Sequence, residues 1–262
     1  MMLCLKHVSC HVAERVLLND ISVTVSAGEI VAVVGKNGAG KSTLLKVASG
    51  LLRPAVGEVM LDGQCVYQLC AKELSKRRGM LMQETPMRAS FTVEQVVGMG
   101  LMSCFLAQRI KIVDEQIARV GLTHLAQRDI MSLSGGERQR AHLARVLAQL
   151  KGGSEECNPG LLLLDEPIAA QDFSRQGLVF KLAKEHVSHG GGCLVVLHDL
   201  NWAAACADRI VMLLEGSIYA QGPPEDILTS KALLDVFDVK VTGVSTHCGT
   251  QKPFVIPHDL NS

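Results

Sequence analysis

The sequence has few aromatic residues, no net charge and no hydrophobic run long enough to cross a bilayer. Its 262 residues include only six Phe, two Tyr and one Trp, and 26 Lys and Arg balance 26 Asp and Glu. This neutrality argues against a protein whose main task is to coat nucleic acid or anionic lipid. In the apolar middle region, the longest stretch without Asp, Glu, Lys or Arg is Gln95–Gln108. A spanning helix needs about 20 apolar residues, so no segment is expected to cross a membrane.

The sequence also lacks a C-x-x-C pair and a basic leader followed by an apolar run. Its nine cysteines are scattered singly, which excludes a zinc knuckle or a thioredoxin-like site. Cys193 and Cys206 stand in apolar runs and are interpreted as small buried hydrophobic residues. We expect a reducing, cytosolic compartment, and the residues Met1–Arg15 predict no cleaved secretion signal.

Two kinds of hydrophobic pattern predict an α/β fold. Ile21, Val23 and Val25 alternate with polar residues, as expected of half-exposed antiparallel strands. Continuous apolar runs, typical of strands buried on both faces, occur at Glu29–Val34, Leu161–Leu164, Cys193–Leu197 and Ile210–Leu214. Helical patterns lie between them at Lys41–Ser49, Gly136–Leu150 and Ser174–His189. Buried strands that alternate with helices indicate a mainly parallel sheet.

A glycine-rich loop of the form G-x-x-x-x-G-K-S follows the first buried strand. It consists of Gly35, Lys36, Asn37, Gly38, Ala39, Gly40, Lys41, Ser42 and Thr43. Glycines let the backbone turn its N–H groups toward a β-phosphate at the positive end of the next helix. Lys41 can reach the β- and γ-phosphates, and the Ser42 hydroxyl can ligate Mg²⁺. The strand–loop–helix setting predicts a P-loop NTPase core.

Ionisable side chains follow two of the other buried strands. Asp165 and Glu166 follow Leu161–Leu164, and His198 follows Cys193–Leu197. Asp165 is expected to hold Mg²⁺, directly or through water, and Glu166 to orient or deprotonate the attacking water. Taken singly, an acidic strand end or a lone histidine is more often structural. Beside a phosphate loop, at the edge where α/β folds bind ligands, the catalytic interpretation is favoured.

Ser134, Gly135 and Gly136 form a second candidate anion site. Ser134 is a good helix N-cap, and Glu137 completes a capping box. The simplest interpretation is a well-capped helix. A glycine-rich helix start also binds anions, however. The chain then has two candidate phosphate-binding elements, this one and the phosphate loop, but only one pair of carboxylates for a metal and catalysis.

These motifs, in this order, resemble the ATP-binding cassette (ABC) family over essentially Leu3–Val255. The matching residues are Gly35–Ser42, Gln83, the signature Leu133–Gln139, Leu161–Glu166, Asp172 and His198. The resemblance implies ATP hydrolysis in a head-to-tail dimer of two copies, in which Ser134, Gly135 and Gly136 of one cap the γ-phosphate held by Lys41 of the other. It also implies that His198 contacts the γ-phosphate, and that Gln83 binds the metal and acts in catalysis.

The division of the chain follows from the motifs. Residues 1–84 are expected to form the antiparallel β part and the phosphate loop, and residues 141–262 the rest of the nucleotide-binding core with a short tail. Residues 85–140 are interpreted as a helical insert that carries the signature, with helical spacing in Val93–Leu106 and Ile112–Val120. Lys151–Gly160 and the tail after Val241 read as linkers.

Three positions depart from the family pattern. Ile168 stands where Thr or Ser is usual, and Gln171 where Leu commonly precedes Asp172. The aromatic residue that often stacks on adenine is missing, because the segment reads His11-Val12-Ala13. His11 could stack instead, and the choice between ATP and GTP stays open at this point.

A single cassette without a membrane span resembles the ATPase subunit of a bacterial importer. That resemblance implies two transmembrane permease subunits, a periplasmic or surface substrate-binding protein, no nucleic acid, and a peripheral place at the cytoplasmic face of the inner membrane. The insert would supply the docking groove, with methionines that repack on closure. These are Met80, Met82, Met87, Met99 and Met102, each equally compatible with an ordinary core role.

Weaker features concern the cargo. His198–Asn201 before an Ala-rich helix, the Gly216–Gly222 ribbon and the short ending resemble the iron-complex and cobalamin branch. Lys151–Gly160 and the tail His247-Cys248-Gly249 with Pro257 resemble haemin-import subunits. Haemin is favoured, and ferric siderophores, cobalamin and metal ions stay open.

Two other classes of protein share part of this pattern. A soluble, non-transport ABC ATPase needs a long coiled-coil insert or a second cassette, for which 262 residues leave no room. A GTPase or small kinase shares the phosphate loop, but the sequence has no N-K-x-D motif and the second anion site would have no role.

Overall fold

The computed structural model describes residues 1–13, 15–83, 87, 89–101, 106–153, 159–240, 244–246 and 252–255. They belong to two compact units, Met1–Gln68 with Cys193–Ser262 and Leu69–Gly192. Several predicted features lie outside the described residues: the boundary at 84 and 85, Met102, 154–158, His247–Gly249 and Pro257. Among the described residues, no helix combines the length and the apolar character that a membrane span requires.

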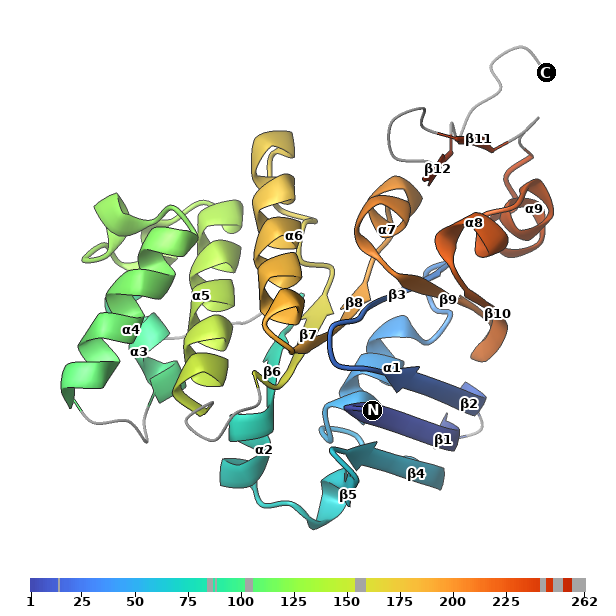
Figure 1. Cartoon of the computed structure of the whole chain (residues 1–262), viewed down its shortest axis with the longest axis horizontal. Coiled ribbons are helices and arrows are strands. Elements are labelled where there is room, and N and C mark those ends of the chain that lie inside the picture. Colours follow the sequence, from blue (N-terminus) through green and yellow to red (C-terminus); the bar gives the residue numbers. More distant parts are fainter. Residues whose placement is uncertain are drawn as a thin grey trace. The chain divides into compact units, whose positions relative to one another are not determined.

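An antiparallel sheet begins the first unit. Its strands lie in the order β2-β1-β4-β5 (Figure 1), with the bounds β1 Leu3–Val12, β2 Arg15–Val25, β4 Val56–Leu61 and β5 Gln64–Cys65. Ile21, Val23 and Val25 are buried, while the side chains between them are partly exposed. The predicted alternation is therefore confirmed.

The first unit also contains three of the four strands predicted from continuous apolar runs. They are β3 Ile30–Gly35, β8 Gly192–Val196 and β9 Arg209–Leu214, followed by β10 Ser217–Gly222. Strand β3 pairs in parallel with both β8 and β9, and β10 is antiparallel to β9. Every residue of β3 is buried, as a strand between two parallel neighbours requires.

Short helices complete this unit. Their bounds are α1 Lys41–Ala48, the 3-10 helix η1 Val66–Gln68, α7 Leu200–Cys206, α8 Pro224–Ile227 and α9 Ser230–Phe237. A small antiparallel pair follows, β11 Ser245–Thr246 with β12 Pro253–Phe254. As predicted, Cys193 and Cys206 are buried, whereas Cys70 is exposed.

The second unit combines two parallel strands with longer helices. Strand β6, Arg78–Leu81, pairs with β7, Leu161–Asp165. The helices are α2 Ala71–Arg77, α3 Val93–Gly98, α4 Leu106–Arg119, α5 Gly135–Gly153 and α6 Phe173–Ser188. Short 3-10 turns lie at η2 Met99–Leu101, η3 Thr123–Leu125 and η4 Ile130–Ser132. Helices α3, α4 and α5 pack against one another (Figure 1).

Several predicted element bounds differ from the structure, among them the helix expected over Ile112–Val120, which begins at Leu106. The helix expected over Val93–Leu106 ends at Gly98 and continues as a 3-10 turn, because glycine favours helix poorly and Gly100 packs against α5. A Cβ at Gly100 would lie 2.4 Å from the Arg145 carbonyl oxygen. The first residues of the expected linker belong to α5, where Lys151 pairs with Glu115 of α4 at 2.5 Å.

Candidate nucleotide site

The phosphate loop of the first unit depends on two glycines. Gly35 has φ +151°, and a Cβ there would lie 2.4 Å from the Leu213 carbonyl oxygen of β9. Gly40 has φ +100°, and a Cβ there would lie 2.6 Å from the Leu17 carbonyl oxygen of β2. Both positions combine a left-handed backbone with a close approach of another strand, so only glycine fits.

The Lys41 ammonium lies inside this loop. Its side chain is buried, and Nζ donates to the carbonyl oxygens of Gly35 at 2.8 Å and Lys36 at 2.9 Å. Helix α1 begins at Lys41, after Gly40, which offers no capping side chain. The positive charge and the helix N-terminus therefore coincide in one cradle, which is the arrangement that binds a phosphate.

His198 is positioned by the parallel register of β3 and β8. Val33 is paired with Val196, and the Leu197 N–H donates to the Val33 carbonyl at 3.1 Å. Gly35 and His198 stand two residues beyond the paired Val33 and Val196, so both lie at the same end of the β3–β8 ladder. His198 is exposed there.

Two side chains that the sequence patterns did not reveal, those of Asp238 and Arg15, also approach the loop. Lys36 forms an ion pair with Asp238, which ends α9 some 202 positions further along the chain. The Arg15 guanidinium at the start of β2 is 3.8 Å from where a Cβ of Gly38 would lie. His11, at the other side of that hairpin, is exposed. The Arg15 guanidinium therefore places a cation beside the loop.

In the second unit, Gln83 and Glu166 meet. Leu81 is paired with Leu164 in the β6–β7 ladder, and Gln83 and Glu166 each stand two residues further on. Gln83 Nε2 donates to Glu166 Oε2 at 2.8 Å. Glu166 has φ +48°, a left-handed conformation that is uncommon for a non-glycine residue. Asp165, which ends β7, is buried.

The signature segment begins α5 as the capping box that the sequence predicts. The Ser134 N–H and hydroxyl donate to Glu137 Oε2 at 2.9 and 2.7 Å, and the Glu137 N–H donates to Ser134 Oγ at 3.3 Å. The bonds from Ser134 lower the pKa of Glu137 below its ordinary value, because they stabilise the carboxylate. Ser134 and Gly135 remain exposed.

The two glycines of the signature differ in what surrounds them. A Cβ at Gly136 would lie 2.7 Å from the Ala170 carbonyl oxygen, so its own unit requires glycine there. A Cβ at Gly135 would meet nothing closer than Ala170 Cβ at 3.7 Å, an ordinary contact. Packing within the unit therefore does not require glycine at position 135.

Gln171 joins the signature helix to the loop that follows Glu166. The Arg140 Nη1 donates to its Oε1 at 2.9 Å, and its Nε2 donates to the Gly136 carbonyl at 2.9 Å and to Gln139 Oε1 at 3.0 Å. Gln139 Nε2 in turn donates to the Glu166 carbonyl at 3.0 Å. A Leu side chain, which is common at this position in the ABC pattern, could form none of these hydrogen bonds.

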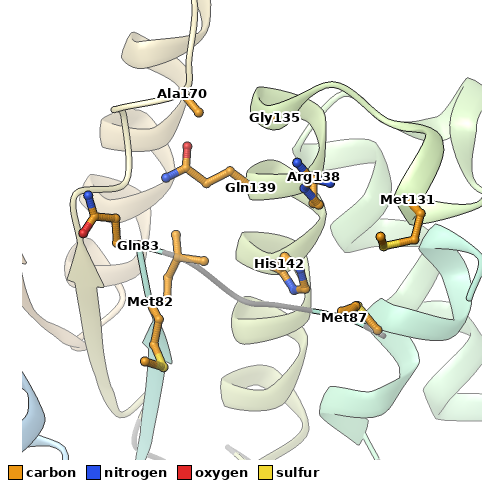
Figure 2. A pocket seen from close by; sticks show the side chains of 10 residues that line it. Met82, Gln83, Met87, Met131, Gly135, Arg138, Gln139, His142 and Ala170 are labelled. Carbon is orange, nitrogen blue, oxygen red and sulfur yellow. The ribbon is translucent and has the colours of Figure 1, made fainter. Parts of the chain in front are cut away.

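A groove of about 540 Å³ opens in the second unit, and Figure 2 shows the side chains that line it. Its lining includes Met82, Gln83, Met87, Met131, Arg138 and His142. Of the predicted docking methionines, Met82 and Met87 line it, whereas Met80 is a buried residue of β6 and Met99 lies elsewhere. Met131 and His142 were not anticipated from the sequence.

The family assignment rests on a comparison that covers more than half of the chain. The sequence model of the ABC transporter family matches residues 18–169.

The chain belongs to the ABC transporter family.

Related sequences and solved structures support this family assignment. The Hemin import ATP-binding protein HmuV of Bradyrhizobium diazoefficiens is 40% identical over 257 residues, 98% of this chain and 95% of the relative. That of Rhodopseudomonas palustris is 44% identical over 241 residues, 92% of this chain and 89% of the relative. An inward-facing putative metal-chelate type ABC transporter is 25% identical, with TM-score 0.79 over 98% of this chain and 97% of that one. A dimeric ATP-binding cassette bound to ADP and Pi is 27% identical, with TM-score 0.75 over 85% of this chain and 99% of that one.

As an ABC ATPase, the chain binds and hydrolyses ATP, and its fold is the P-loop NTPase core expected from the motifs. The described residues of the first unit contain the phosphate loop and His198, and those of the second contain Gln83, Asp165, Glu166 and the signature. Ile168, where the ABC pattern has Thr or Ser, is buried. The site residues are accordingly distributed over two units.

The Gln171 network generates a first prediction. Gln171→Leu removes the acceptor of the buried Arg140 and two donor bonds, so we expect the free energy of unfolding to fall by about 1–3 kcal/mol. Urea unfolding measures it. The same change at the exposed Gln127 should stay within about 0.5 kcal/mol of wild type. Equal free energies of unfolding for Gln171→Leu and wild type would show that the hydrogen bonds of Gln171 do not stabilise the fold.

Proposed function

We propose that this chain is the ATP-hydrolysing subunit that energises a bacterial ABC importer, with haemin as the cargo. The observation that carries the proposal is the resemblance over more than nine-tenths of the chain to proteins named as hemin import ATP-binding proteins, at 38 to 44% identity. The subunit would be peripheral, at the cytoplasmic face of the inner membrane, with two transmembrane permease subunits and, indirectly, a periplasmic or surface substrate-binding protein as partners.

Two copies of the chain would form a head-to-tail dimer around ATP. The phosphate loop supplies a buried ammonium and a helix N-terminus, and the signature supplies a second, exposed helix start. The bare backbone at Gly135, which packing within its own unit does not require, suits a close approach by the γ-phosphate bound to the other copy. Closure would then depend on the γ-phosphate, since only ATP carries it.

Hydrolysis would use residues of both units. Glu166 is the candidate base for the attacking water. Gln83 donates a hydrogen bond to the Glu166 carboxylate, and Gln139 donates one to the Glu166 backbone carbonyl. His198 would contact the γ-phosphate from the edge that it shares with Gly35. The Ser42 hydroxyl, the Asp165 carboxylate and the Gln83 amide are hard oxygen donors, which fits Mg²⁺; the ion would neutralise phosphate charge.

The groove beside Gln83 is the proposed docking site for the permease. Its methionine side chains can repack when the dimer closes. Gln83 belongs to the groove and is also bonded to Glu166, so a helix seated in the groove would act on the catalytic carboxylate through one side chain.

Another cargo of the same class is the main alternative. The likeness to a putative metal-chelate type transporter favours the broader class of metal chelates, which includes ferric siderophores and cobalamin. A soluble, non-transport ABC ATPase is the alternative from a different class, and it would leave the Met-lined groove without an occupant.

Uptake measurements test the cargo. Vesicles that contain the chain, its co-purified permease and the binding protein should accumulate haemin when ATP is supplied on the side of the ATPase. Ferric siderophore and cobalamin serve as competing cargoes in the same vesicles. ATP-dependent uptake of one of these without haemin would overturn the haemin assignment, and failure to co-purify any permease would overturn the transport role.

Glu166→Gln tests the catalytic carboxylate. The amide keeps the shape and can still accept the bond from Gln83, but it cannot take a proton, so turnover should fall by at least about 100-fold. ATP binding should persist, and a dimer should accumulate in size-exclusion chromatography with ATP. Glu185→Gln, at a carboxylate paired with Arg119, is the matched control and should turn over like wild type. Wild-type turnover in Glu166→Gln would remove Glu166 from this role.

Gly135→Ala tests the dimer. The added methyl meets only an ordinary contact, so unfolding should shift by no more than about 0.5 kcal/mol. ATP-driven dimerisation of the Glu166→Gln background should weaken about tenfold or more, the equivalent of about 1.4 kcal/mol. Gly136→Ala is the contrasting variant and should lower stability by about 1–3 kcal/mol through its clash with Ala170. Unimpaired dimerisation of Gly135→Ala would contradict the capping role.

A further inference from the structure

His142 is a buried histidine whose ring has no hydrogen-bond partner among the described residues. It lies on α5 in the groove, with 4% of its surface exposed, and both Nδ1 and Nε2 lack a partner in the described part of the chain. Burial, reinforced by Arg145 and Arg138, lowers its pKa to about 4. At neutral pH the ring is therefore uncharged, with one N–H donor and one acceptor nitrogen.

The second unit contains a contrasting histidine. His186 on α6 is also largely enclosed, but its Nε2 lies 3.0 Å from the Gly160 carbonyl oxygen. Buried polar groups are normally paired, and leaving one unpaired costs stability. Because no described residue pairs with this ring at the wall of the groove, a molecule that binds in the groove is a candidate partner.

The character of the groove indicates what that group is. Figure 2 shows the His142 ring one turn along α5 from Arg138, on the side of the helix toward Met87 and Met131. Among the described lining residues there is one cation, Arg138, and no carboxylate. Apolar methionine side chains around a cation and an N–H donor complement an apolar helix that carries an acidic residue.

We propose that a carboxylate on a cytoplasmic helix of the permease enters this groove, accepts a hydrogen bond from the His142 ring and pairs with Arg138. This inference rests on the proposed transport function and adds to it a specific contact. His142 and Arg138 are four residues apart on α5, so one side chain between them can reach both. In this proposal the His142 ring gains its hydrogen-bond partner when the permease binds.

The proposal predicts opposite effects of one substitution on stability and on assembly. His142→Leu removes the unpaired nitrogens, so the melting temperature of the isolated chain should rise by about 2–4 °C. Its affinity for the detergent-solubilised permease that co-purifies with the wild-type chain should fall about tenfold, which corresponds to about 1.4 kcal/mol. His142→Gln keeps a donor and an acceptor and should recover most of the affinity.

His186→Leu is the matched control. It removes a histidine that already has a partner, so it should lower the melting temperature and leave permease affinity at the wild-type value. On the permease side, each Asp and Glu of the cytoplasmic loops is changed singly to its amide. One of these changes should weaken binding to the wild-type chain but add little to the effect of His142→Leu, as residues in contact do.

The outcomes separate the two proposals. Wild-type affinity in His142→Leu, or a loss of affinity accompanied by a lower melting temperature, would overturn the role of His142. Full additivity of His142→Leu with every permease change would overturn the carboxylate contact. A wild-type chain that binds no permease would instead overturn the proposed transport function.

Discussion

Parallel strand pairing is the constraint on which the rest of this site depends. In a parallel pair, both strands run out of the sheet at the same edge, so the residues that follow them are brought together whatever their separation in sequence. Gly35 and His198 leave the β3–β8 ladder two positions beyond its last pair, and Gln83 and Glu166 do the same after β6–β7. For the second pair the outcome is a hydrogen bond across 83 positions. Register alone thus concentrates the chemistry-bearing side chains.

A polar network then holds the carboxylate that we propose as the catalytic base, Glu166. Glu166 follows a buried strand in a left-handed backbone conformation, and its surroundings hold it through the side chain of Gln83 and the backbone bond from Gln139. Gln171 extends the same network to the signature helix. Gln83 lines the groove and is bonded to Glu166, so the groove and this network share one side chain.

Local patterns predicted the elements well, and long-range packing explains where they did not. The buried strands, the capping box of Ser134 and Glu137 and the phosphate loop each depend on residues close together in sequence, and all were predicted. The helix expected over Val93–Leu106 is shorter because Gly100 meets the backbone of α5, a contact with residue 145. Lys151 was expected in a linker, yet its ion pair with Glu115 on another helix accompanies its place in α5.

The sequence by itself determined the chemistry of the nucleotide site, since a tight phosphate loop needs glycines at particular backbone angles and a lysine at the start of its helix. It also determined the ABC assignment, because the motifs occur in order along the chain. Only the tertiary structure decided which side chains meet: Gln83 with Glu166, Gln171 with Arg140, and Lys36 with Asp238. It alone distinguished Gly135 from Gly136, and His142, which has no hydrogen-bond partner among the described residues, from the paired His186. The reason is physical: periodicity reports which face of an element is buried, whereas the partner of a buried polar group is set by the element packed against it.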